Sequence, residues 1–121
     1  MQKLKALIVD DETDICYLLS SILKQKNIQS VLAGSLAAAE IAMKADHDFS
    51  YVFLDNHLVD GSGIASISRL KKELPLSRLI MITAHDTKAN REKALENGAD
   101  FFLGKPFSKD TIFKTIESCN P

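Results

Sequence analysis

The stretch ALIVDDE, residues 6–12, decides the fold class of this chain. It opens with a run of four apolar residues and ends in the acids Asp10, Asp11 and Glu12. A short, uninterrupted apolar run is typical of a strand that is buried on both faces of a parallel sheet. In open sheets of this class, functional sites lie at the carboxyl ends of the strands. The stretch therefore predicts a buried strand with an acidic site at its end.

Apolar runs of similar length recur along the rest of the chain and alternate with helical patterns. The other predicted strands are Gln29–Leu32, Tyr51–Leu54, Leu79–Ile82 and Phe101–Leu103. The predicted helices are one capped by Thr13 or Asp14, one that Ser35 opens, Gly63–Leu74, Thr87–Asn97 with Gly98 as C-cap, and Ser108–Ser118. This alternation predicts an α/β protein in which helices cover both faces of a parallel sheet.

Length and composition limit the classes of protein that fit. The chain has 121 residues, 45% of them apolar, which predicts one domain over residues 1–121. Its net charge of −1 argues against non-specific nucleic-acid binding, and no apolar run approaches the roughly 20 residues of a membrane span. The first strand starts so early that no signal peptide is expected. Cys16 and Cys119 fit no metal-binding spacing and are interpreted as reduced thiols of a cytoplasmic protein.

Side chains that suit phosphoryl-transfer chemistry follow three of the other predicted strands. Asp55 ends the third strand, Thr83 ends the fourth, and Lys105 follows the fifth. Together with Asp10 and Asp11 they are expected to converge on one rim of the sheet. Crowded carboxylates repel one another unless a cation lies among them, and Mg²⁺ prefers such oxygen ligands. A carboxylate can also form an aspartyl-phosphate, whose oxygens a lysine and a hydroxyl would bind.

Four motifs in this order resemble the receiver domain of bacterial two-component response regulators. They are LIVDDE at 7–12, VFLDNHLVDGSG at 52–63, MITA at 81–84 and GKPF at 104–107, and the resemblance covers essentially the whole chain. It implies the flavodoxin-like doubly wound (βα)5 fold, with a five-stranded parallel sheet of order 2-1-3-4-5. It also implies a phosphoacceptor signalling domain rather than an enzyme, although such a domain assists its own phosphorylation and dephosphorylation.

The resemblance assigns roles to the acids of the rim. Asp55 would be the phosphoacceptor and would receive its phosphoryl group from the phosphohistidine of a histidine kinase or a histidine phosphotransfer protein. Asp10, Asp11 and Asp55 would hold Mg²⁺ together with the main-chain carbonyl of His57. The side chain of His57 would then point elsewhere.

The resemblance also implies a switch. Thr83 would bond the phosphoryl group, and the ring of Phe102 would turn inward when Thr83 moves. Lys105 would pair with the phosphoryl group, and its peptide bond to Pro106 is expected to be cis, an arrangement that is accessible only before proline.

Other positions near the rim adjust or depart from the family pattern. His57 and His85 are expected to tune dephosphorylation, and two imidazoles would also suit a transition metal. Val59 stands where such receivers usually carry proline, so the loop 56–63 is expected to be more mobile. Gly104 is expected to loosen the placement of the lysine that follows it.

Two other functions stay open at this point. Residues 10–13 come near the nucleophile motif of haloacid dehalogenase-type phosphohydrolases, although Glu12 stands where that motif has its second aspartate. A degenerate receiver that acts only as a scaffold is the other alternative, and crowded carboxylates without a use argue against it.

The receiver interpretation also sets expectations for partners. Besides the phosphodonor, we expect an unknown effector protein or a missing C-terminal output domain. Direct nucleic-acid binding by this domain and membrane contact are not expected. The domain would be a monomer or a phosphorylation-dependent dimer.

Overall fold

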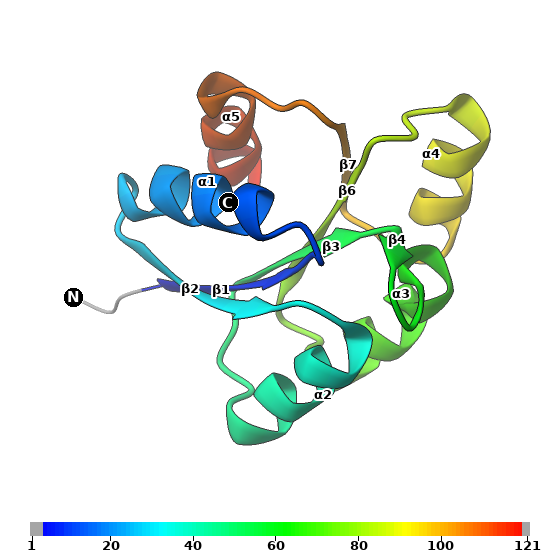
Figure 1. Cartoon of the computed structure of the whole chain (residues 1–121), viewed down its shortest axis with the longest axis horizontal. Helices are drawn as coiled ribbons and strands as arrows, with labels where there is room; N and C mark the ends of the chain where they lie inside the picture. The colour runs from blue at the N-terminus through cyan, green and yellow to red at the C-terminus, as the bar shows by residue number, and fades with distance from the viewer. Residues whose placement is uncertain (1–3, 120–121) are drawn as a thin grey trace.

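The computed structural model describes residues 4–119, and its parallel five-stranded sheet carries helices on both faces (Figure 1). The strands run in the order β2-β1-β3-β6-β7, and every neighbouring pair is parallel. Their bounds are β1 Leu4–Val9, β2 Ile28–Ala33, β3 Tyr51–Asp55, β6 Arg78–Thr83 and β7 Phe101–Gly104. Numbered among themselves, these five strands have the order 2-1-3-4-5, which confirms the expected flavodoxin-like fold.

The helices form two layers that enclose separate hydrophobic cores. One layer consists of α1 (Thr13–Lys24) and α5 (Lys109–Cys119), and the other of α2 (Leu36–Ala45), α3 (Gly63–Glu73) and α4 (Lys88–Glu96) (Figure 1). Within residues 4–119, no helix is long and apolar enough to cross a membrane.

The central strand β3 is buried along its whole length. Its side chains alternate between the two cores: Val52 and Leu54 pack under α2, α3 and α4, whereas Phe53 packs under α1 and α5. A strand between two helical layers needs apolar side chains on both of its faces. This explains why the strands of this chain read as continuous apolar runs.

The start of α1 differs from the prediction. Thr13 is the first helical residue and Glu12 is the N-cap, but no side chain caps the helix. Asp10 Oδ1 instead accepts the N–H of Glu12 at 2.9 Å, and the Glu12 carboxylate contacts Lys105. The acids before α1 thus make their contacts at the carboxyl edge of the sheet instead of capping the helix. The prediction that Thr13 or Asp14 is the N-cap is wrong.

The starts of α2 and α4 agree with the sequence pattern, whereas α4 ends at Glu96 with Asn97, and not Gly98, as its C-cap. Ser35 Oγ accepts the N–H of Ala38 at 3.0 Å, and Thr87 Oγ1 accepts the N–H of Asn90 at 3.1 Å. Gly98 follows the last turn of α4 with a φ of 110°, a conformation that glycine adopts without strain.

A short hairpin lies between β3 and α3, where the sequence suggested a mobile loop. Its strands are β4 (His57–Leu58) and β5 (Gly61–Ser62), which pair antiparallel. The carboxylate of Asp60, in the turn, accepts the N–H groups of Leu36 and Ala37 at 2.8 and 2.9 Å. The first turn of a helix has free N–H groups and favours negative charge, and these bonds lower the pKa of Asp60. The hairpin is therefore tied to α2 without the proline that is usual in this loop.

Gly63 allows α3 to start directly against the end of β3. A Cβ atom at this position would lie 2.1 Å from the carbonyl oxygen of Asp55 and 3.0 Å from the Cα of Asn56. The N–H of Gly63 also donates to the carbonyl of Asn56 at 2.8 Å. This close approach of two backbones requires glycine and fixes the position at which β3 ends.

We expect Gly63→Ala to lower the free energy of unfolding by about 2–4 kcal/mol, because the clash is with backbone that cannot rotate away. Gly34→Ala is the matched control, since a Cβ there would meet nothing within 4 Å, and its effect should stay within about 0.5 kcal/mol. Urea denaturation of the two variants measures both values. Equal stability of the variants would show that the approach at Gly63 is not a constraint.

Candidate functional site

Three carboxylates meet at the carboxyl edge of the sheet, as the sequence predicted. Asp10 and Asp11 follow β1, and Asp55 is the last residue of β3. One carboxylate oxygen from each residue lies within 4.8 Å of the others. Asp10 is 1% exposed and Asp55 is 4% exposed, whereas Asp11 faces solvent. The site therefore consists of two buried acids with a third acid at its mouth.

The ammonium group of Lys105 lies among these acids. Its Nζ is 2.8 Å from Asp10 Oδ2, 2.9 Å from Glu12 Oε1 and 3.6 Å from Asp55 Oδ2. The lysine side chain is only 8% exposed, and the peptide bond to Pro106 is cis. One ammonium group thus faces three carboxylates.

The backbone on both sides of Lys105 places it at the site. Its N–H donates to the carbonyl of Thr83 at 2.7 Å, and Gly104 pairs with Thr83 in the sheet. The side chain of Asp86 lies against Gly104, where a Cβ would be 2.8 Å from an Asp86 oxygen. A small residue at position 104 therefore lets the loop after β6 pack against β7.

The crowding of charges shifts the pKa values of Asp55 and Lys105. Burial raises the pKa of Asp55, and the nearby Asp10 raises it further. Burial alone would lower the pKa of Lys105, but its contacts with Asp10 and Glu12 outweigh burial, so this pKa is raised. The lysine remains charged, whereas Asp55 is a stronger base than an ordinary aspartate.

The donor set fits a hard divalent cation. Asp10 Oδ2 is buried and has no hydrogen-bond partner among the described residues, so its 2.8 Å contact with Lys105 is an ion pair without good hydrogen-bond geometry. An oxygen in this situation keeps lone pairs for a further cation. Clustered carboxylates with access to solvent are the ligands that Mg²⁺ and Ca²⁺ prefer.

Thr83 lies beside the acids at the end of β6 and is fully buried. Its hydroxyl oxygen accepts the backbone N–H of His85 at 3.1 Å. The side chain of His57 is exposed and is not one of the groups that converge with the acids. The rings of His57 and His85 contact each other edge to face, with centres 4.6 Å apart.

Phe102 lies on β7 and packs in the core under α4, not at the acidic edge. It is 7% exposed, whereas its neighbour Phe101 is half-buried in the other core. The guanidinium of Arg91 lies over the Phe102 ring at 5.2 Å and also pairs with Asp86 at 2.8 Å. The ring expected to turn inward is thus already packed inward.

Sequence reasoning gave no role to two residues of the site. Glu12 pairs with Lys105, which its place directly after the two aspartates could have suggested. Cys16 lies beneath the acids, where its thiol donates to the carbonyl of Asp10 at 3.2 Å. Burial, with a contribution from Asp10, raises the pKa of Cys16 to about 11, so it stays a thiol.

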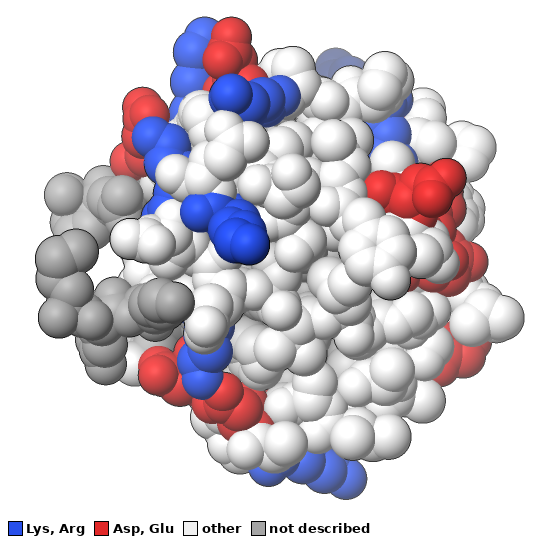
Figure 2. Space-filling view, turned by 60° about the vertical axis from the view of Figure 1, so that its left-hand side comes forward, with Lys and Arg blue, Asp and Glu red and all other residues white. Residues whose placement is uncertain are grey.

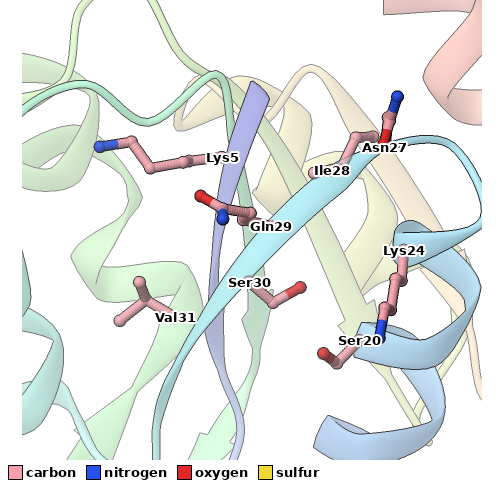
Figure 3. Close-up of a pocket in the computed structure, with 8 residues that line it drawn as sticks. All are labelled: Lys5, Ser20, Lys24, Asn27, Ile28, Gln29, Ser30 and Val31. Atoms are coloured by element: carbon pink, nitrogen blue, oxygen red, sulfur yellow. The ribbon is translucent and has the colours of Figure 1, made fainter. Parts of the chain in front are cut away.

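A hollow of about 560 Å³ lies away from this site, around the outer edge of β2. Its side chains lie on both sides of the strand and their polar ends point apart (Figure 3). The Lys5 ammonium is paired with Asp46. Charged side chains lie mainly around the rim of this side of the molecule, and its middle is largely uncharged (Figure 2). The hollow shows no convergent set of polar groups.

The fold and the acidic edge together define an α/β domain whose side chains suit a divalent cation and phosphoryl-transfer chemistry. The sequence matches the family model of the response regulator receiver domain over residues 6–117. The chain belongs to this family, and it is a receiver domain of the two-component response regulators.

Individual relatives agree with this assignment. The chain is 34% identical over 116 residues to an NtrX-like response regulator of Rickettsia bellii, which covers 93% of this chain and 24% of that protein. It is 32% identical over 117 residues to the phosphate regulon transcriptional regulatory protein PhoB of Escherichia coli, covering 94% and 50%. The chain therefore spans a quarter to a half of the length of these relatives.

A solved structure with a somewhat higher sequence identity shows the same fold. The beryllofluoride-activated NtrC4 receiver domain dimer superposes with a TM-score of 0.88 and 36% identity, covering 95% of this chain and 94% of that one. A two-component response regulator from Clostridium difficile superposes with a TM-score of 0.90 at 23% identity, which shows the fold.

We expect Asp55→Asn to raise the free energy of unfolding by about 1 kcal/mol at neutral pH in the presence of a metal chelator. The amide removes a buried charge and its repulsion with Asp10, while Lys105 keeps its two closer partners. The folded pKa of Asp55 lies above its unfolded value, so wild type gains stability as the pH falls and the carboxyl group becomes protonated. The difference between the proteins should therefore shrink toward about pH 4.

Denaturant unfolding at the two pH values measures this difference. The matched control is Asp48→Asn, an exposed aspartate outside the site, which should change stability by less than about 0.5 kcal/mol. A loss of stability in Asp55→Asn at neutral pH would show that the Lys105 contact outweighs the repulsion.

Proposed function

We propose that the chain accepts a phosphoryl group on Asp55 from the phosphohistidine of a histidine kinase or a histidine phosphotransfer protein. The observation that carries the proposal is the buried Asp55 carboxylate, within 4.8 Å of Asp10 and Asp11 and beside the Lys105 ammonium. A carboxylate oxygen of Asp55 attacks phosphorus and the P–N bond breaks. The donor's imidazole nitrogen leaves with the electron pair, and an acyl phosphate remains on Asp55.

Mg²⁺ is the cation that we propose for the acidic edge. The carboxylates of Asp10, Asp11 and Asp55 would hold it, together with the main-chain carbonyl of His57. When bound, the ion neutralises charge on the phosphoryl oxygens. The exposed position of Asp11 supports this set, because it leaves the mouth of the site open to water and to an incoming phosphoryl group.

Lys105 supplies the positive charge that belongs to the chain itself. Its Nζ is farther from Asp55 than from Asp10 and Glu12, at 3.6 Å against 2.8 and 2.9 Å. Oxygens of a phosphoryl group on Asp55 would extend from the carboxylate and come within its reach. We propose that Lys105 exchanges part of its contact with the two other acids for the phosphoryl group.

Thr83 and Phe102 are the residues that we propose for the switch. The Thr83 hydroxyl now accepts the N–H of His85, and bonding a phosphoryl oxygen would require it to donate in another direction. The loop after β6 would then shift, and with it Asp86 and Arg91, which lies over the Phe102 ring. The rings of His57 and His85, two residues after Asp55 and Thr83, contact each other, and we propose that they tune the lifetime of the acyl phosphate.

We propose that residues 1–121 form one receiver domain that acts through an effector protein or through a C-terminal output domain. The greater length of the relatives supports the second arrangement. The NtrC4 receiver dimer supports a change from monomer to dimer on phosphorylation. Two free, buried cysteines support a cytoplasmic location. We assign nucleic-acid contact to the output domain and not to this one.

The hydrolase alternative is not favoured. Glu12 is paired with Lys105 at 2.9 Å, and the family match covers nearly the whole chain. A degenerate receiver would keep the fold without the chemistry, and the experiment below separates it from the proposal.

Incubation with Mg²⁺ and either a phosphohistidine donor or a small acyl phosphate should add one phosphoryl group at Asp55. Asp55→Asn should abolish labelling, and Lys105→Ala should slow it by roughly 10²-fold, since charge stabilisation of the transition state is lost. Lys72→Ala, an exposed lysine of α3, is the matched control and should react like wild type. Intact-mass measurement with peptide mapping gives the rates and the position. A folded protein that takes no label from either donor would be a scaffold.

A further inference from the structure

Two imidazoles follow the strand ends that carry Asp55 and Thr83, and the function proposed above gives them no role in binding a ligand. His57 lies on β4, two residues after Asp55, and His85 follows β6, two residues after Thr83. Both side chains are exposed, and their ring centres lie 4.6 Å apart with the planes at 79°. The contact joins the two loops that enclose the end of β3 and the end of β6.

The ring separation matches that of two imidazoles on one metal ion. Metal–nitrogen distances of about 2.0–2.1 Å place the centres of two adjacent imidazole ligands roughly 4.5–5.3 Å apart, the shorter value for a right angle at the ion and the longer for a tetrahedral angle. The 4.6 Å between His57 and His85 falls in this range. Because both rings are exposed, a rotation that turns one nitrogen of each toward a common ion meets little resistance.

We propose that His57 and His85 form a two-imidazole site for a borderline transition ion of the Zn²⁺ or Ni²⁺ class. Imidazole favours such ions, whereas the carboxylates of Asp10, Asp11 and Asp55 favour Mg²⁺, so two cations can be sorted by ligand chemistry. Among the described residues, only the acidic cluster brings three or more candidate ligands together. Water therefore completes the coordination of an ion at the imidazole pair.

Electrostatics favours a dication at this position. Asp10, Asp11 and Asp55 supply more negative charge than Lys105 neutralises. His85 is bonded through its backbone N–H to Thr83, at the end of β6 on the same edge of the sheet. Asp86 is already paired with Arg91, so it adds no free carboxylate to the imidazole site. The affinity of the ion comes from two ligands and a favourable field.

An ion at this pair would oppose phosphorylation, an effect that rests on the proposed function of Asp55. The backbone N–H of His85 donates to the Thr83 hydroxyl at 3.1 Å, so a fixed His85 keeps Thr83 in its present contact. The ion would also stand over the approach to Asp55. By linkage, phosphorylation would weaken ion binding by the same factor by which the ion disfavours phosphorylation.

The binding test uses Ni²⁺, which does not oxidise the thiols, and saturating Mg²⁺, which occupies the acidic edge. Calorimetry on the unphosphorylated chain should show one Ni²⁺ equivalent, and NMR should show that the His57 and His85 imidazole signals broaden together. His57→Gln and His85→Gln should each weaken binding by about tenfold or more, because each removes half of the protein ligands. His47→Gln, at the third histidine of the chain, is the matched control and should bind like wild type.

Two results would overturn the site. Unchanged Ni²⁺ affinity in both His57→Gln and His85→Gln would do so, as would loss of binding in Asp11→Asn while the histidine variants retain it. Either result would leave the ring contact as simple packing of two exposed side chains.

A second experiment tests the coupling. The rate of Mg²⁺-dependent labelling is measured with and without Ni²⁺, and each variant is compared with its own rate without Ni²⁺. Wild type and His47→Gln should slow several-fold, whereas His57→Gln and His85→Gln should show no slowing. Equal slowing in all four proteins would overturn the coupling. A chain that takes no label in Mg²⁺ alone would instead overturn the proposed function, and the binding result would stand apart from it.

Discussion

The ammonium group of Lys105 lies among the carboxylates of Asp10, Glu12 and Asp55, and the arrangement of the whole carboxyl edge depends on this one charge. Buried like charges within a few ångströms would otherwise destabilise the fold. The compensation is incomplete, because the pKa of Asp55 remains raised. Lys105 thus stabilises the site but leaves part of its negative charge uncompensated. Uncompensated negative charge is the property that a cation site requires.

The sheet makes this arrangement possible through backbone alone. Parallel strands end at the same level, so residues 45 positions apart in the chain, Asp10 and Asp55, become neighbours. The N–H of Lys105 is bonded to the carbonyl of Thr83, which carries the register of β6 and β7 into the loop beyond them. On the other side, Gly63 lets α3 lie against the carbonyl of Asp55. Side-chain positions at the edge follow from these backbone contacts.

The sequence predicted the parts of the molecule that depend on local pattern. Continuous apolar runs gave all five main strands, and polar residues at their ends gave the acids, the hydroxyl and the lysine. The start of α1 was mispredicted because an N-cap contributes only about 1 kcal/mol, and the tertiary contacts of the acids at the edge outweighed it. Glu12 as a partner of Lys105 and Asp60 as a partner of α2 join segments far apart in the chain. No local pattern encodes such contacts.

Phe102 shows what kind of energy a switch in this domain can use. Burying a phenylalanine ring contributes roughly 1.5–3 kcal/mol. The Phe102 ring is only 7% exposed in this structure, so that contribution is already present in the unphosphorylated domain. A ligand shifts an equilibrium only by interactions that differ between the two states. In the switch proposed above, the differing interactions are therefore polar: they involve the hydroxyl of Thr83, which now accepts from His85, and the ammonium of Lys105, which now lies closer to Asp10 and Glu12 than to Asp55. In the proposed switch, the aromatic residue would transmit a change that these two groups decide.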